Sequence, residues 1–300
     1  MPGIRWGLCC QFLDAPIRFR TATHRYVATL DPAARLEYLR AIARDNARAL
    51  LDAIDRCAEL GIGAFRINSQ ILPLATDPVT GYRLSDIDVD GSIVAAFISA
   101  GERARATGIR LSFHPDQFVV LNSEQERVVL SSLAEMEAQG AIASVVGADV
   151  LTLHGGGMAG GVAAALVRLE RGIERLDAAS RARIALENDD RCFTPEVLLP
   201  LCERLSVPFV YDVHHHRCLP DTLDVATASS RAASTWKNRE PYFHISSPRE
   251  GWDGPCRPHA DFVDPRDFPD AWRSMDLSVD VEAKAKERAV LALRDAIEAV

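Results

Sequence analysis

Eight short apolar runs recur along this chain, and each leads into a polar residue. They are unbroken rather than alternating in hydrophobicity, which is typical of parallel strands buried on both faces. Stretches with helical periodicity lie between successive runs, so strands and helices alternate. This order predicts an α/β protein folded as a single (β/α)8 barrel, the TIM barrel. The runs cover residues 4–10, 64–68, 109–114, 150–154, 184–188, 209–212, 242–246 and 277–282.

The helical pattern is clearest at residues 32–60, where Asp31 and Pro32 predict the start and Gly61 the end. A (β/α)8 barrel needs about 250 residues. The 300 residues of this chain therefore suit one barrel domain, residues 1–300, with longer loops. In this fold such loops normally surround the active-site mouth. The other predicted helices cover residues 87–107, 124–146, 161–179, 195–205, 221–235 and 283–299. Loop insertions are expected near residues 11–30, 69–86 and 247–268.

Composition narrows the class of protein. A net charge of −8 argues against a surface that grips nucleic acid all over, but it leaves a local basic groove open. No window has the roughly 18 unbroken apolar residues of a membrane span, and the first residues do not resemble a signal peptide. The seven cysteines form no Cys-x-x-Cys pair, which favours reduced thiols. We expect a cytoplasmic protein that needs neither a membrane nor an obligate protein partner.

From the third run onward, the strand ends carry histidine or a carboxylate. One histidine on an apolar strand is more often a packed core residue than a ligand. Six such groups are hard to assign to packing, because the strand ends of a parallel barrel converge at one mouth. Imidazoles together with carboxylates suit zinc, manganese or iron. The six residues are His114, His154, Glu187, Asp212, His244 and Glu282.

Two further histidines extend this set. His215 follows Asp212 by three residues, and His259 lies in the long loop before the last run. A single catalytic metal usually takes about three protein ligands. Eight candidates are enough for two or three divalent metals, an arrangement that clamps the attacking and leaving oxygens in phosphodiester hydrolysis.

Eight segments resemble the UV damage endonucleases, a barrel family related to the endonuclease-four type of AP endonuclease. The match runs from the first strand to the last in the same order, and it is specific as a set. The segments are Phe-Arg-Ile at 65–67, Leu-Ser-Phe-His-Pro-Asp-Gln-Phe at 111–118, Leu-His-Gly-Gly at 153–156, Leu-Glu-Asn-Asp at 186–189, Asp-Val-His-His at 212–215, His-Ile-Ser-Ser at 244–247, His-Ala at 259–260 and Val-Glu-Ala-Lys at 281–284.

The resemblance implies a metal-dependent phosphodiesterase. Its substrate would be damaged double-stranded DNA, nicked 5′ to a lesion through metal-activated water, with manganese expected ahead of zinc or iron. Glu187 would bridge two metals. The implied ligand sets are His114, His154 and Glu187 for the first metal, Glu187, Asp212, His244 and Glu282 for the second, and His215 and His259 for the third.

The resemblance also implies other roles. The family's lesion-probing Gln-Tyr pair corresponds to Gln117 and Phe118, which keep the apolar bulk of the wedge but lose a hydroxyl. Apart from the resemblance, Arg66 falls near a predicted loop and is a candidate contact for substrate phosphate. The residues expected to carry catalysis are Glu187, His154, Glu282 and Lys284.

Three further positions depart from the family. Tyr242 stands where a modified lysine binds metal, and a phenol cannot be carboxylated, so the third metal should bind weakly or not at all. Leu8 and Phe12 replace a tyrosine and an asparagine that line the pocket for flipped nucleotides. We expect these three residues to contact substrate in a pocket that matches the family only in part.

Two alternatives stay open at this point. The chain could be another metal-dependent barrel enzyme, an isomerase or oxidase of a small molecule, because fold does not fix function. It could also be a non-catalytic metal-binding or damage-sensing module. Nicking of irradiated DNA separates the first reading from both alternatives, and metal content separates a hydrolase from an iron oxidase.

Overall fold

The computed structural model describes residues 3–299. Its eight strands are parallel and close into a barrel in sequence order, as predicted. Each strand begins and ends within one residue of a predicted run. The strands are β1 (Ile4–Cys9), β2 (Ala64–Ile67), β3 (Arg110–Phe113), β4 (Val150–His154), β5 (Ile184–Glu187), β6 (Phe209–Asp212), β7 (Tyr242–Ile245) and β8 (Leu277–Val281).

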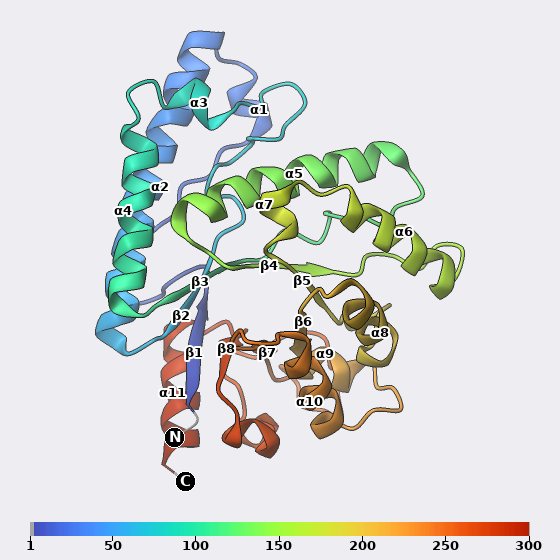
Figure 1. Cartoon of the computed structure of the whole chain (residues 1–300). Helices are drawn as coiled ribbons and strands as arrows, with labels where there is room; N and C mark the ends of the chain where they lie inside the picture. Colours follow the sequence, from blue (N-terminus) through green and yellow to red (C-terminus); the bar gives the residue numbers. More distant parts are fainter. Residues whose placement is uncertain (1–2, 300) are drawn as a thin grey trace.

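Helices surround the barrel, and α2 and α4 run side by side along one flank (Figure 1). The longest helix, α2, begins after Asp31, whose carboxylate accepts hydrogen bonds from the first turn, and ends at Gly61 with φ of 67°. The helices are α1 (His24–Val27), α2 (Pro32–Leu60), α3 (Leu84–Ile87), α4 (Ser92–Thr107), α5 (Glu126–Val146), α6 (Val162–Glu174), α7 (Ala178–Arg181), α8 (Pro195–Leu205), α9 (Val213–Cys218), α10 (Val225–Thr235) and α11 (Glu287–Glu298), with short 3-10 turns η1 (Pro265–Asp267) and η2 (Asp270–Ser274).

Local capping explains where the helices differ from the predicted ranges. The helix predicted at 87–107 begins only at Ser92, because Asp88 accepts hydrogen bonds from Ile93 N and Val94 N in the first turn of α4. The last helix begins only at Glu287 rather than at 283. The carboxylate of Glu287 accepts hydrogen bonds from Leu13 N, which ties the helix start to the loop after β1.

Inward-facing side chains build the barrel interior in layers. Residues two apart in a strand face the same way, so each inward residue near a strand start predicts another inward residue two positions later. Ala185 and Val210 belong to a small buried apolar cluster. Glu187 and Asp212 stand two residues further on, at the carboxyl ends of the same strands. The barrel interior thus has an apolar layer near the strand starts and a polar layer at the carboxyl ends of the strands.

The long loops at 11–30, 69–86 and 247–268 follow the carboxyl ends of β1, β2 and β7. Two of them contain short helices that the sequence did not predict, α1 and part of α3. Within residues 3–299, no helix combines the length and the apolar character that a membrane crossing requires.

Candidate metal centre

Glu187 lies at the middle of the site. It ends β5 and is fully buried. Its Oε2 is 2.8 Å from His114 Nε2 and 3.0 Å from His154 Nε2. Its Oε1 is 2.8 Å from His244 Nδ1. Three imidazoles from three different strand ends therefore face one carboxylate.

A helix cap brings a fourth imidazole to the same point. Asp212 ends β6 and caps the helix α9, because its Oδ1 accepts a hydrogen bond of 2.7 Å from His215 N in the first turn. His215 Nδ1 then lies 3.5 Å from both Glu187 Oε1 and Asp212 Oδ2. Asn188 holds this turn in place, because its side chain exchanges two hydrogen bonds with the Asp212 backbone.

Seven of the eight predicted ligands fall into three overlapping groups whose ligand atoms lie within 4.8 Å of one another. Glu187 and His244 each belong to two groups. The grouping differs from the implied sets, because His215 lies with His154 and Glu187 rather than with His259. The groups are His114, Glu187 and His244; His154, Glu187 and His215; and Asp212, His244 and Glu282.

His259 lies further from the others. Its loop forms an isolated bridge with Pro248, and its Nδ1 is 3.7 Å from Glu282 Oε2. The rings of His259 and His215 are 6.4 Å apart. The pair expected to hold a third metal is therefore not brought together as the other candidate ligands are.

The site couples its charges strongly. Burial alone would raise the pKa of Glu187, but the charges of His244, His154 and His114 outweigh it and hold the pKa well below its usual range. Burial lowers the pKa of His244, yet Glu187 prevails and raises it to about 9. Burial likewise lowers the pKa of His215, but the charges of Asp212 and Glu187 raise it to about 9. The buried carboxylates thus favour positive charge close to them, which a divalent metal would supply in place of protons.

The residues fit divalent cations. Asp212 Oδ2 is buried and has no hydrogen-bond partner among residues 3–299, and His154 Nε2, although 3.0 Å from Glu187 Oε2, is not aligned to form a hydrogen bond with it. Unpartnered buried polar atoms are costly, so a cation would satisfy both. Nitrogen and carboxylate donors suit manganese, zinc or iron, and no thiol belongs to the three groups.

A cavity of about 510 Å³ opens above the site. Arg66 lies on its wall and pairs with Glu282, with 2.6 Å between Arg66 Nη1 and Glu282 Oε1. Gln117 and Phe118 stand at its rim, and Phe118 is 70% exposed. Lys284 is exposed just after β8 but is not part of this cavity lining.

Three predicted substrate contacts lie elsewhere. Strand alternation turns the Leu8 side chain away from the barrel interior. It is fully buried in the main core outside the barrel. Phe12 is also buried and stacks on Phe65. Tyr242 is fully buried beneath His244, and its hydroxyl donates to Asp280 Oδ1. The expectation that these three residues line a substrate pocket has no support in the structure, because packed atoms surround each side chain.

Sequence reasoning did not assign a role to several residues near the site. Cys10, Asn68 and Asp116 line the mouth cavity. Asp280 is fully buried in β8, two residues before Glu282. The signal for Asp280 was available, because a carboxylate inside an otherwise buried strand and two positions from a ligand must face the same interior.

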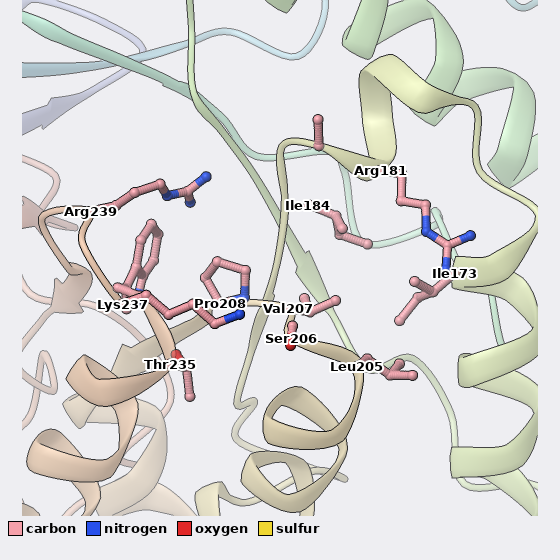
Figure 2. A pocket seen from close by; sticks show the side chains of 12 residues that line it. Ile173, Arg181, Ile184, Leu205, Ser206, Val207, Pro208, Thr235, Lys237 and Arg239 are labelled. Carbon is pink, nitrogen blue, oxygen red and sulfur yellow. The ribbon is translucent and has the colours of Figure 1, made fainter.

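Another cavity, of about 300 Å³, lies away from the metal centre (Figure 2). It is formed by the segments that lead into β5 and β6 and by the end of α10. Arg181, Lys237 and Arg239 line it together with apolar side chains. None of the predicted site residues is among its lining residues, so the chemistry expected from the sequence belongs to the mouth alone.

Comparisons with known proteins agree with this architecture. The family model described as UV-endonuclease UvdE matches residues 4–300. A UV DNA damage endonuclease of Deinococcus radiodurans is 34% identical over 304 residues, covering 96% of this chain and 94% of that protein. The crystal structure of SacUVDE superposes with a TM-score of 0.88 at 24% identity, covering 99% of both chains. Endonuclease IV from Thermus thermophilus superposes with a TM-score of 0.64 at 16% identity, covering 99% of this chain and 100% of that one.

The two solved structures share the barrel fold with this chain, and the sequence comparisons extend over nearly its whole length. This chain therefore belongs to the UV-endonuclease UvdE family, whose model matches residues 4–300.

Proposed function

We propose that this protein is a metal-dependent endonuclease that nicks UV-damaged double-stranded DNA 5′ to the lesion. The observation that carries the proposal is the convergence of His114, His154 and His244 on the buried Glu187 at the carboxyl end of the barrel. Membership in the UvdE family supplies the substrate class.

Two or three divalent metals would be held by the predicted ligand residues, with manganese first among the candidates. When bound, such metals supply Lewis acidity that stabilises charge on the phosphate oxygens and activates water. Glu187 would bridge two of them, because its two oxygens face different imidazoles. His259 and Glu282 would hold the most weakly bound cation, since His259 belongs to none of the three groups and approaches only Glu282 among the candidate carboxylates.

Arg66 keeps the carboxylates of the site in place. Its guanidinium pairs with Glu282 and lies 3.7 Å from Asp280 Oδ2. The side chain is only 11% exposed, but it is part of the mouth cavity. An arginine in this position orients Glu282 and offers positive charge to a phosphate that enters the cavity.

Gln117 and Phe118 would open the duplex. Phe118 projects from the rim with 70% of its surface exposed, whereas most aromatic side chains of this protein are buried. An apolar wedge replaces lost base stacking, and a damaged step costs least to open. The two residues would therefore select lesions by the ease of unstacking.

An isomerase or oxidase of a small molecule remains the alternative enzyme class, because several chemistries share this barrel. The exposed Phe118, beside Gln117 in the lining of the mouth cavity, favours the nuclease, because an aromatic side chain in this place can stack on an unpaired base.

Irradiated and untreated supercoiled plasmid tests the proposal, with Mn²⁺ supplied to EDTA-treated protein. Nicking of irradiated plasmid only, and only with metal present, is the expected result. Equal nicking of both plasmids would contradict lesion selection. No nicking, together with turnover of a sugar or oxidation by bound iron, would support the alternative class.

A further inference from the structure

Asp280 is a fully buried carboxylate directly beneath the metal centre. It stands two residues before Glu282, so both side chains face the barrel interior. Asp280 Oδ1 accepts a hydrogen bond of 2.8 Å from the Tyr242 hydroxyl. Asp280 Oδ2 has no hydrogen-bond partner among the described residues.

Two donors face this unpartnered oxygen. His244 Nε2 lies 3.8 Å from Asp280 Oδ2, and Arg66 Nε lies 3.7 Å from it. Both nitrogens are themselves buried and without a partner in residues 3–299. One acceptor and two donors thus converge in a space closed to water, and a small movement of the carboxylate would join them.

The absence of a side chain at Gly7 leaves room for the Asp280 carboxylate. Gly7 pairs with Asp280 across β1 and β8, and a Cβ atom at Gly7 would lie 2.2 Å from Asp280 Oδ1. On the other side, the Tyr242 hydroxyl contacts Ser112 Oγ at 2.9 Å, which fixes the donor that holds Asp280. Any side chain at Gly7 would displace the carboxylate.

The two nitrogens of His244 face different partners. Nδ1 faces Glu187 and Glu282, at 2.8 Å and 3.4 Å, where metal is expected. Nε2 faces Asp280. A metal-binding imidazole must present a lone pair on one nitrogen, and an acceptor behind the other nitrogen sets that tautomer, fixes the ring and increases its basicity.

We infer that Asp280, held by Tyr242, is a positioning residue that orients His244 and keeps its proton on Nε2 so that Nδ1 binds metal. The inference rests on the metal centre proposed above. It gives Tyr242 a role distinct from the substrate contact that the sequence suggested, because the phenol acts through Asp280.

Co²⁺ titration of the EDTA-treated protein tests the inference, with the cobalt absorption spectrum as the readout. Asp280→Ala should lower Co²⁺ affinity by roughly 10- to 100-fold and shift the absorption bands. Asp280→Asn keeps an acceptor oxygen and should lose less. Tyr242→Phe should also weaken binding. Tyr211→Phe is the matched control, because it removes a buried hydroxyl that bonds His216 outside the three ligand groups.

Thermal unfolding of the metal-free variants separates positioning from general stability. Parent-like affinity and spectrum in Asp280→Ala would overturn the inference. A loss of affinity that Tyr211→Phe reproduces at an equal fall in Tm would also overturn it. Should Asp280→Ala fail to fold, parent-like binding by both Asp280→Asn and Tyr242→Phe decides against the inference. Failure of the parent to bind Co²⁺ would instead refute the metal centre itself.

Discussion

His244 Nδ1 lies 2.8 Å from Glu187 Oε1, although the two residues belong to strands β7 and β5, which β6 separates in the barrel. The contact therefore crosses the mouth rather than following one pair of strands. Such a contact forms only because the barrel closes and brings its strand ends together. Glu187 and His244 each belong to two of the three groups of candidate ligands, so this contact lies where the groups overlap.

Glu187→Gln should lower nicking activity by at least roughly 100-fold at saturating Mn²⁺, because a neutral amide binds a hard cation far more weakly than a carboxylate does. The rate of plasmid nicking measures this effect, and the Tm of the metal-free protein shows that the barrel is folded. Glu203→Gln, which alters an exposed pair with Arg231, is the control. Normal turnover by Glu187→Gln would refute the bridging role.

Metal content should show two tightly held cations and a third held more loosely. Seven candidate ligands make up the three overlapping groups, whereas His259 belongs to none of them. Dialysis against limited chelator followed by elemental analysis should remove the third metal first. His259→Ala should abolish the weak site and leave the two tight sites unchanged. Three cations of equal affinity would contradict this account.

Phe118→Ala should raise the Kd for a damaged duplex by roughly tenfold, since stacking of one aromatic ring on a base is worth about 1–3 kcal/mol. Metal content should not change, because Phe118 belongs to none of the three ligand groups. Phe118→Tyr should bind at least as well as the parent. Leu130→Ala, an exposed position on α5, serves as the control. Equal affinity of Phe118→Ala and the parent would rule out the wedge.

The sequence was sufficient for the barrel and for the positions of most candidate ligands. Each buried run ends on its polar residue, and strand ends must meet once the barrel closes. The facing of most side chains was not predictable, because unbroken apolar runs carry no period that separates inside from outside, and only a polar residue such as Asp280, two positions from a candidate ligand, reveals it. Leu8 was assigned to a pocket because it aligns with a pocket-lining tyrosine of the family, although it points away from Gly7 and Asp280, which pair between β1 and β8.

The helix α9 was also missed. Its six residues are too short for a periodic pattern, and it forms because the Asp212 carboxylate caps His215 N. This cap determines where His215 lies, so the sequence could name the ligand but not the group it joins. The position of His259 depends on a longer-range contact, the backbone bridge between Pro248 and His259.

Stability should depend on Asp77 in the loop at 69–86. Burial alone would raise the pKa of Asp77, but hydrogen bonds from Thr80 and Val79 lower it to about 2. A carboxyl with a lowered folded-state pKa contributes stability above its unfolded pKa of about 3.9 and loses it as pH falls toward 2. The contribution should be about 1 kcal/mol, since water reaches the carboxylate.

Urea unfolding of the parent and of Asp77→Asn measures this contribution at pH 7 and pH 3. The difference in unfolding free energy should be larger at pH 7. A difference that stays constant or grows as pH falls would contradict the assignment of stability to the ionised Asp77.

The central claim is that the strand-end cluster around Glu187 is the metal centre of a UV-damage endonuclease. It is tested most directly with a duplex oligonucleotide that carries one UV photoproduct at a known position. With Mn²⁺, the parent should cut the damaged strand on the 5′ side of the photoproduct, and Glu187→Gln should leave it intact. No cleavage of the damaged duplex above the undamaged control, with metal bound to the protein, would contradict the account.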